Sequence, residues 1–283
     1  MRKCLACDAT DTVSDNVCSA CGAEQFHIDL GLKDCGFKAS YFADLACFEK
    51  KHFWFRARKE LVVWSMAEYG KNSSSFLEIG CGTGYILSEI AKAYPHIKLY
   101  GSEIFAEGLL FAAARLSGGV ELMKIDAHAI PFIDAFDTIG AFDVLEHICE
   151  DDLVLNQMHD ALRTGGLILL TVPQHKWLWS SVDEYSCHVR RYSANEIHAK
   201  LVAAGFEVLR STSFVSFILP AMLVSRMLKR LVSRGKKNIA AELELSFLMN
   251  SIFDAIMQLE ISLIRLGMNF PLGGSRLVVA RKA

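Results

Sequence analysis

The stretch Phe76-Leu77-Glu78-Ile79-Gly80-Cys81-Gly82-Thr83-Gly84 decides the fold of this chain. An apolar run ends in three glycines at alternate positions, and a segment with a helical pattern, residues 86–93, follows it. This order predicts a buried strand, a tight turn and a helix. Glycines let the backbone approach a ligand and adopt a positive φ without a Cβ clash. The N–H groups at a helix start point into the same space, so the turn predicts a site for a nucleotide-like cofactor.

The spacing of the glycines separates this turn from two other nucleotide-binding turns. A dinucleotide fingerprint needs a third glycine where this chain has Tyr85, and no Gly-Lys-Ser/Thr of a P-loop follows. The pattern is E-x-G-x-G-x-G, and it resembles motif I of the class I S-adenosylmethionine (SAM) methyltransferases. The resemblance implies that SAM is bound by the residues of this motif, Glu78, Gly80, Cys81, Gly82 and Gly84.

Four further segments continue the resemblance in the order of the family. Residues 98–104 form a second predicted strand that ends in Glu103, 19 positions beyond Gly84, a separation that suits a carboxylate accepting bonds from both ribose hydroxyls. A third strand is predicted over 120–126, a fourth strand with its loop over 136–147, and a fifth over 165–173. The resemblance implies that the ends of these strands complete the cofactor site, through Ile104, Asp126 and Ala127 (at the adenine amine and ring), Asp143 and Val144.

The resemblance implies an α/β fold with a seven-stranded Rossmann-like sheet and helices on both faces. The alternative is an unrelated Rossmann-like domain with an empty glycine turn. Composition agrees with one sizeable core, because the 283 residues are 52% hydrophobic. A net charge of −2 gives no basic field, so we expect no nucleic acid as the main partner. Nine cysteines without a secretory signal favour a reducing, cytoplasmic location.

Two short cysteine pairs lie near the N-terminus. Cys4-x-x-Cys7 and Cys18-x-x-Cys21 can present four thiolates from two tight turns, which suits a structural, tetrahedral Zn²⁺ site. A segment this short has little core of its own, so the metal would supply its folding free energy. The alternatives are a redox pair or unligated thiols. The other five cysteines are scattered, and we interpret them as packing residues.

Methyl transfer to a neutral hydroxyl requires a general base, and such a base is expected beyond the carboxyl ends of the strands. Three histidines follow predicted strands four and five and are the catalytic candidates: His147, His175 and His188. For His147 the alternative is that the Glu-His pair only orders the loop.

The segment 183–193 resembles the D-x(n)-H-x-R-R-Y pattern of a methyltransferase subgroup often found among glycan and lipid-linked saccharide genes. We expect His188, Arg190 and Arg191 to hold an anionic acceptor, since arginine forks bind phosphate or carboxylate well, and Tyr192 to contribute to substrate binding. The alternative is that the arginines pair with Asp183 and Glu184. A helix is predicted from residue 52 to 69, and its residues Phe53, Trp54 and Phe55 are candidates to wall the sulfonium, with Trp54 also a substrate-binding candidate. The alternative is that these three residues only pack the helix onto the sheet.

About sixty residues separate predicted strands six (206–215) and seven (275–282), far more than a hairpin needs. The apolar run 214–224 would reach only about 17 Å as a helix, against about 30 Å for a bilayer core, so it cannot span a membrane. Basic residues follow it, so we predict peripheral membrane contact through 214–237, at the inner face of the membrane. For the second apolar segment, 243–266, a homodimer interface or a lid is an alternative.

These observations predict five regions and one function. The regions are a zinc ribbon (1–30), a connector with a lid helix (31–70), the SAM-binding core (71–215), an apolar helical insertion (216–270) and the final strand (271–283). We expect methyl transfer from SAM to a small-molecule or lipid-linked acceptor, as O-methylation of a saccharide. The alternatives are C- or N-methylation of a sugar, lipid or quinone precursor, and a non-catalytic adaptor.

Overall fold

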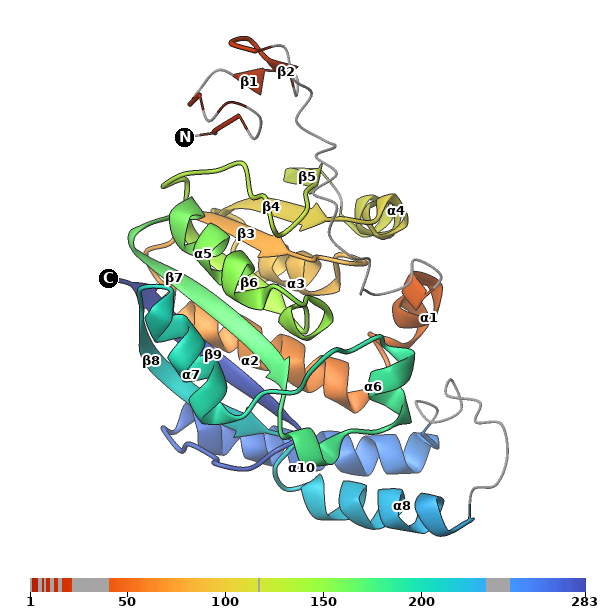
Figure 1. Ribbon diagram of the computed structural model, residues 1–283. Coiled ribbons are helices and arrows are strands. Elements are labelled where there is room, and N and C mark those ends of the chain that lie inside the picture. The colour runs from red at the N-terminus through yellow and green to blue at the C-terminus, as the bar shows by residue number, and fades with distance from the viewer. Residues whose placement is uncertain are drawn as a thin grey trace.

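The structure is a computed structural model that describes residues 2–4, 7, 9–10, 13–14, 17–21, 41–116, 118–232 and 245–283. At the N-terminus, β1 (Val13–Ser14) and β2 (Val17–Cys18) form a small antiparallel hairpin. Figure 1 shows this hairpin above the main sheet, near its β5 edge. The backbone N–H of Lys3 donates to the carbonyl of Pro131 at 3.2 Å, so the N-terminal segment contacts the core.

The main sheet has seven strands in the order β5-β4-β3-β6-β7-β9-β8. The first five run parallel, and β9 is antiparallel to both β7 and β8. Each strand coincides with one predicted from the sequence: β3 (Ser75–Ile79), β4 (Lys98–Glu103), β5 (Val120–Lys124), β6 (Phe136–Phe142), β7 (Leu162–Pro173), β8 (Phe206–Phe214) and β9 (Ser275–Lys282). The strand order reverses at β3, and open α/β sheets bind ligands at such a switch point.

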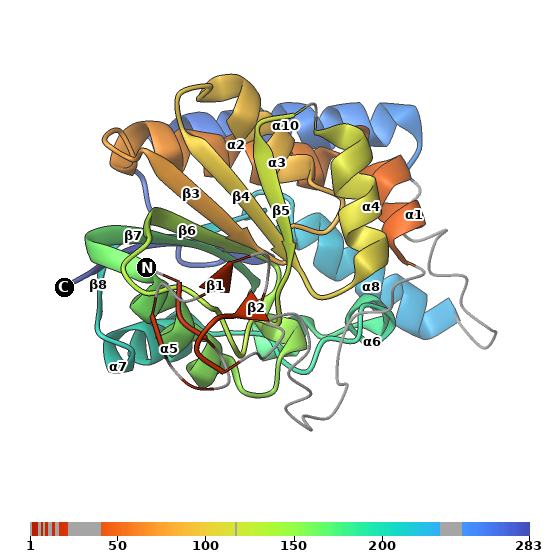
Figure 2. The same ribbon diagram turned by 90° about the horizontal axis from the view of Figure 1, so that it is seen from above.

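Strand β3 is buried along its whole length because it pairs with β4 on one side and β6 on the other. Its side chains alternate between the two faces of the sheet. Phe76 packs with α2 (Phe53–Tyr69), α3 (Tyr85–Ala93) and α4 (Ala106–Arg115), whereas Leu77 packs with α5 (Asp151–Ala161) and α7 (Ala194–Ala203). Figure 2 shows the two helical layers on opposite faces. The predicted three-layer α/β architecture is confirmed.

Several short elements follow the carboxyl ends of the parallel strands. The 3-10 helix η1 (Leu145–His147) follows β6, while η2 (Lys176–Leu178) and helix α6 (Ser181–Tyr185) follow β7. Helix α1 (Tyr41–Phe48) lies within the predicted connector and is found near these short elements. The ring of Tyr41 stacks on the ring of Tyr185 with 4.3 Å between centroids, so α1 contacts the loop after β7.

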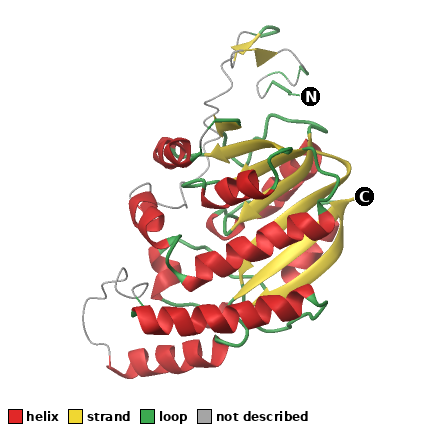
Figure 3. Ribbon diagram, turned by 180° about the vertical axis from the view of Figure 1, so that it is seen from behind, coloured by secondary structure: helices red, strands yellow, loops and turns green. Residues whose placement is uncertain are grey.

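The insertion between β8 and β9 contains α8 (Leu219–Val232) and α10 (Phe247–Arg265), which lie at the end of the molecule far from the hairpin (Figure 3). Helix α10 docks on α2 through a buried apolar face and through an ion pair of 2.8 Å between Arg56 and Asp254. By length and composition α10 is also apolar enough to cross a membrane. Its outward face is apolar as well, with Phe247 87% exposed. Of the basic residues predicted to contact a membrane, those from 233 onward lie outside the described residues.

Candidate functional site

The glycine turn after β3 has three left-handed residues, with φ of 65° at Gly80, 52° at Gly82 and 72° at Gly84. The three positions differ in what surrounds them. A Cβ on Gly80 would lie 2.7 Å from Cγ2 of Val144, and one on Gly84 would lie 3.1 Å from Cα of Ala112. A Cβ on Gly82 would meet only the ring of Phe42, at 3.6 Å. Close packing therefore requires Gly80 and Gly84, whereas among the described residues only the Phe42 side chain lies over Gly82.

The carboxylate of Glu103 lies directly beside Gly82. Its Oε2 accepts from the backbone N–H of Gly82 at 3.0 Å, and its Oε1 accepts from Ile104 at 2.8 Å and Phe105 at 3.1 Å. Burial raises the pKa of Glu103, and the three backbone bonds act in the opposite direction. Two carboxylate oxygens offer about four acceptor positions, so this geometry leaves capacity for another hydroxyl donor.

Helix α1 covers the glycine turn. Phe42 is buried, and a Cβ on Gly108 would lie 2.9 Å from the Cζ atom of the Phe42 ring. Just after α1, the carboxylate of Glu49 accepts from the hydroxyl of Thr83 at 2.6 Å and from Nη1 of Arg115 at 2.8 Å. Sequence reasoning expected only some helix in the connector and missed both covering residues. An aromatic side chain in a short helix carries no signal of what it covers.

The loop after β5 holds the residues predicted to meet adenine. Oδ1 of Asp126 accepts from the backbone N–H of His128 at 2.9 Å and lies 2.6 Å from its Nδ1. Burial acts to raise the pKa of Asp126, but these bonds outweigh it and the pKa is lowered. Ala127 is half-buried beside it, and Ile104 across the turn is 45% exposed. An ionised acid and an exposed apolar side chain suit an adenine amine and ring.

A buried arginine organises the end of β6. Nη1 of Arg58 donates to Oδ2 of Asp143 at 2.7 Å, and the hydroxyl of Thr171 donates to the same oxygen at 2.7 Å. Asp143 itself has a φ of 58°. The side chain of Glu78 is buried nearby, with Oε2 lacking a hydrogen-bond partner in the described structure, and burial raises its pKa well above the usual value.

The aromatic residues at the start of α2 are placed by this arginine. The guanidinium of Arg58 lies 4.7 Å from the centroid of the Trp54 ring, and Nε1 of Trp54 donates to Oγ of Ser275 at 3.4 Å. Phe53 and Phe55 are buried in the core. One face of Trp54 is therefore used by Arg58, and the packing interpretation holds for the two phenylalanines. The contact of Trp54 with substrate stays a prediction.

Two of the three candidate histidines come together with a glutamate. Ligand atoms of Glu146, His147 and His188 all lie within 4.8 Å of one another, and we call these three residues the acceptor cluster. The rings of His147 and His188 meet edge to face, with 4.8 Å between centroids. His175 is not a member of this group; its ring stacks on Trp177 at 5.1 Å, and it stays a separate prediction.

The polar residues after His188 have partners inside the protein. Arg191 donates from Nε and Nη2 to Asp183, at 2.6 and 3.1 Å, and Arg190 donates from Nη1 to Asp151 at 2.7 Å. The hydroxyl of Tyr192, a fully buried residue, donates to Asp151 at 2.7 Å. These contacts do not favour the predicted acceptor-binding role of the three residues. They instead hold the loop that carries His188.

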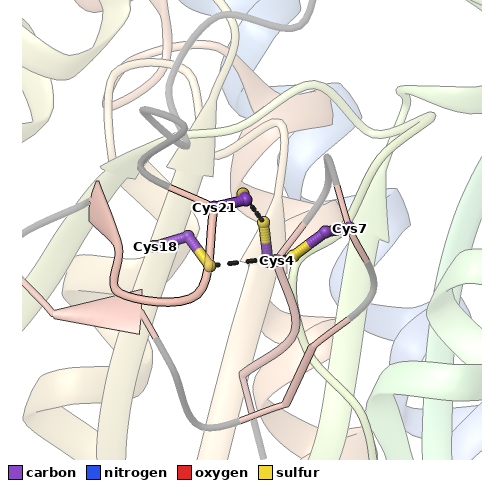
Figure 4. A group of neighbouring side chains, drawn as sticks. All are labelled: Cys4, Cys7, Cys18 and Cys21. Carbon is purple, nitrogen blue, oxygen red and sulfur yellow. Dashed lines mark hydrogen bonds between the residues drawn. The ribbon is translucent and has the colours of Figure 1, made fainter.

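The four N-terminal cysteines converge as their spacing predicted, and Figure 4 shows them. Their sulfur atoms all lie within 4.8 Å of one another, with 3.6 Å between Cys4 and Cys21 and 3.8 Å between Cys7 and Cys18. A tetrahedral Zn²⁺ with bonds of about 2.3 Å requires a sulfur–sulfur separation of about 3.8 Å. A disulfide would bring two sulfurs to about 2.05 Å. The residues fit a structural zinc ion.

The switch point at β3, the glycine turn and the acid at the end of the next strand define the class I SAM-dependent methyltransferase fold. The family described as a methyltransferase domain matches residues 49–211, more than half of the sequence, and the chain belongs to this family. The predicted family is therefore confirmed.

Relatives and solved structures agree on the fold and differ in chemistry. The chain is 26% identical over 165 residues to a "probable S-adenosylmethionine-dependent methyltransferase" of Mycolicibacterium smegmatis, covering 56% of this chain and 61% of that one. It thus spans less than two thirds of that relative's length. A phosphoethanolamine N-methyltransferase 2 of Haemonchus contortus, solved with SAM, has a TM-score of 0.57 at 16% identity, over 87% of this chain and 57% of that chain. The [4+2]-cyclase SpnF has a TM-score of 0.52 at 23% identity, over 78% of this chain and 80% of that chain. Such low identity supports the fold alone, and one fold hosts many reactions.

Proposed function

We propose that this chain transfers the methyl group of SAM to a hydroxyl oxygen of a small-molecule or lipid-linked acceptor, with a saccharide as the expected acceptor. The observation that carries the SAM part is the carboxylate of Glu103, held 3.0 Å from the N–H of Gly82, where a Cβ would meet only the Phe42 ring among the described residues. A ribose diol placed there would donate to Glu103 while the rest of the nucleoside lies along the turn.

The other cofactor contacts follow from the same placement. In our proposal the adenine amine meets Asp126 and the ring lies between Ile104 and Ala127, while the methionine portion extends past Gly80 and Gly84 toward Asp143. Glu78, Cys81 and Val144 support the turn from below. Because Phe42 covers Gly82, SAM must enter by displacing α1 or by sliding beneath it.

Methyl transfer needs little acid or base at the sulfonium. The acceptor oxygen attacks the methyl carbon, the C–S bond breaks with its electron pair going to sulfur, and S-adenosylhomocysteine leaves. Charge is dispersed as this happens, so positioning and exclusion of water contribute most. A hydroxyl acceptor must also lose its proton. We therefore place the acceptor hydroxyl at the acceptor cluster, which follows Asp143 along the chain. The loop residue Val144, between Asp143 and the cluster, packs against Gly80 and ties it to the cofactor turn.

A Zn²⁺ ion held by Cys4, Cys7, Cys18 and Cys21 fits the proposal as a structural part. Four thiolates leave no open position for substrate, so this ion would order the N-terminal residues rather than take part in transfer. We propose the region boundaries predicted from the sequence, with α1 and α2 as the lid segment.

The exposed face of α10 favours contact with a membrane or with a second copy of the chain. Isolated apolar residues are common on surfaces, but this face also includes Leu248 at 68% exposure and Leu259 at 57%. Sedimentation with anionic liposomes and the oligomeric state in solution distinguish the two partners. If this face contacts a membrane, a lipid-linked acceptor must also be able to reach the acceptor cluster from the membrane surface.

Calorimetric titration of the full chain with SAM tests the cofactor part. We expect one site per chain, and a loss of roughly 10- to 100-fold in affinity for Glu103→Gln, because hydrogen bonds to a charged group contribute about 1.5–3 kcal/mol. Glu107→Gln is the matched control, since Glu107 is an exposed acid on the following helix. A Glu103→Gln variant that binds like the control would contradict the placement.

Labelled SAM tests the acceptor part. Incubation with matched hydroxyl and amine acceptors, followed by mass spectrometry, shows which atom carries the methyl group. Transfer to oxygen supports the proposal. Transfer to nitrogen or carbon alone would replace it, and SAM binding without transfer to any extract component would favour a non-catalytic adaptor.

A further inference from the structure

The acceptor cluster contains a buried carboxylate that the protein leaves unsatisfied. Glu146 lies in η1, directly after the loop that carries Asp143, and its exposed fraction is 0%. Neither of its carboxylate oxygens has a hydrogen-bond partner in the described structure. A buried carboxylate is normally paired, hydrogen-bonded or bound to a metal, because burial without compensation is costly. Among the described residues no hydrogen bond compensates this carboxylate, which leaves it to a proton or to a bound cation.

The imidazole of His188 lies beside this carboxylate but not within hydrogen-bond distance of it. Nε2 of His188 lies 3.9 Å from Oε1 of Glu146, which is beyond hydrogen-bond distance. Nδ1 of the same ring lies 2.9 Å from Oδ1 of Asp183. Asp183 is fully buried and is held by Arg191 and by the backbone N–H of Ser180. These contacts fix the ring of His188 and leave its Nε2 directed at Glu146.

Such an arrangement is typical of a metal ligand. A histidine bound to a metal usually donates its other ring N–H to a carboxylate, which sets its tautomer and orientation. His147 adds a second imidazole to the group, and the ligand atoms of the three residues lie within 4.8 Å of one another. Ligands bound at about 2.0–2.2 Å lie about 3–4 Å apart, so small side-chain movements suffice. Two imidazoles and one carboxylate suit divalent first-row metals and leave coordination positions open.

We propose that Glu146, His147 and His188 bind one divalent transition-metal cation of the Mn²⁺, Fe²⁺ or Zn²⁺ class, with Asp183 as a positioning residue for His188. The N-terminal cysteine tetrad offers only sulfur and forms a separate site. A cation at the cluster compensates the charge of Glu146. It also takes the place of a side-chain base, because all three members of the cluster are then ligands.

The role of this cation rests on the proposed function. Its open positions bind the acceptor hydroxyl, which lowers the pKa of that hydroxyl, and the proton passes to solvent water. The resulting oxygen attacks the methyl carbon of SAM, and the electron pair of the C–S bond stays on sulfur. More than one open position selects an acceptor with two adjacent oxygens, such as a vicinal diol. The acceptor class is therefore a chelating oxygen donor rather than an amine.

Mn²⁺ is the probe of choice, because thiolates select softer metals and leave Mn²⁺ to nitrogen and oxygen ligands. We expect titration of the full zinc-loaded chain, followed by electron paramagnetic resonance, to show one bound Mn²⁺ per chain. Glu146→Gln and His188→Ala should each weaken binding at least tenfold. Asp183→Asn should weaken it 10- to 100-fold, the usual effect of losing such a partner. His96→Ala, an exposed histidine away from the cluster, is the control and should bind Mn²⁺ like the wild type.

Two further measurements distinguish loss of the cation site from misfolding of a variant and from failure of the proposed function. Electron spin echo modulation on the wild type should show coupling to imidazole nitrogen, and it needs no variant. SAM affinity measured on each variant should stay within about twofold of the wild type. No Mn²⁺ bound at millimolar concentration, no nitrogen coupling, or binding unchanged in both Glu146→Gln and His188→Ala would overturn the cation site. If SAM fails to bind the wild type while Mn²⁺ binds, the proposed function fails and the cation site stands.

Discussion

Replacing Gly82 by alanine tests whether this residue is needed for SAM binding or only for the left-handed backbone of the glycine turn. Among the described residues, a Cβ at this position meets the ring of Phe42 alone, at 3.6 Å, which is an ordinary contact. The packing cost is therefore small. The remaining cost is conformational, because a left-handed φ of 52° disfavours a side chain by about 1–2 kcal/mol. We expect the free energy of unfolding to fall by that amount and the melting temperature to fall by about 2–8 °C.

SAM affinity should fall much further than stability. If the donor lies against the backbone of Gly82, a methyl group there occupies cofactor space, and a loss of at least 100-fold corresponds to about 2.7 kcal/mol. Gly165→Ala is the matched control. Its φ is 77°, a Cβ there would meet no atom of the described residues within 4 Å, and it lies at the exposed start of β7.

Calorimetric titration with SAM and thermal unfolding of both variants complete the test. Both proteins should lose similar stability, while Gly165→Ala keeps the wild-type affinity for SAM. Normal SAM binding by Gly82→Ala would refute the placement of the cofactor against this turn. Equal loss of SAM affinity in both variants would assign the effect to stability instead.

Three further predictions concern stability and metal content. Asp143→Asn should lower the free energy of unfolding in urea by about 3 kcal/mol, because it leaves the buried guanidinium of Arg58 without its anionic partner; a change under about 1 kcal/mol contradicts this. His52 accepts from the N–H of Trp54 at 3.2 Å as the N-cap of α2, and burial, with Arg56, lowers its pKa to about 4. Its contribution is therefore full above pH 6.5 and is lost as the pH falls toward 4, and His52→Asn should show about 2 kcal/mol less loss over this interval; identical pH profiles would refute the assignment. Elemental analysis should find one zinc per chain that Cys18→Ser lacks, with the melting of the main sheet unchanged; a zinc-free wild type would rule out the tetrad as a zinc site.

The sequence predicted the sheet well because its signals are local. Alternating glycines, the acid that ends β4 and the two glycines near the start of β7 each lie within or beside the strands they mark. The seven strands and the convergence of four cysteines followed from such short patterns. Glu103 reached Gly82 as expected, since a carboxylate at the end of one strand faces the turn after its neighbour in a parallel sheet.

The parts that could not be predicted depend on contacts between distant residues. The sequence left open whether Arg191 binds Asp183 or a substrate anion, because both partners look alike to a guanidinium, and the structure shows the pair with Asp183. The placement of Phe42 over Gly82 depends on a helix forty residues earlier. Glu146 was noted only as half of a Glu-His pair, and its unsatisfied carboxylate becomes visible only when β6, α6 and the loop to α7 are assembled.

The central claim is that a SAM-type nucleoside lies along the β3–α3 turn with its diol on Glu103. A crystal structure of the chain grown with S-adenosylhomocysteine tests it most directly. We predict a ribose hydroxyl donating to Oε2 of Glu103 and the nucleoside over Gly82, with the Phe42 ring displaced or stacked on it. A ligand bound elsewhere, or a turn that stays covered by Phe42 at saturating ligand, would contradict the account.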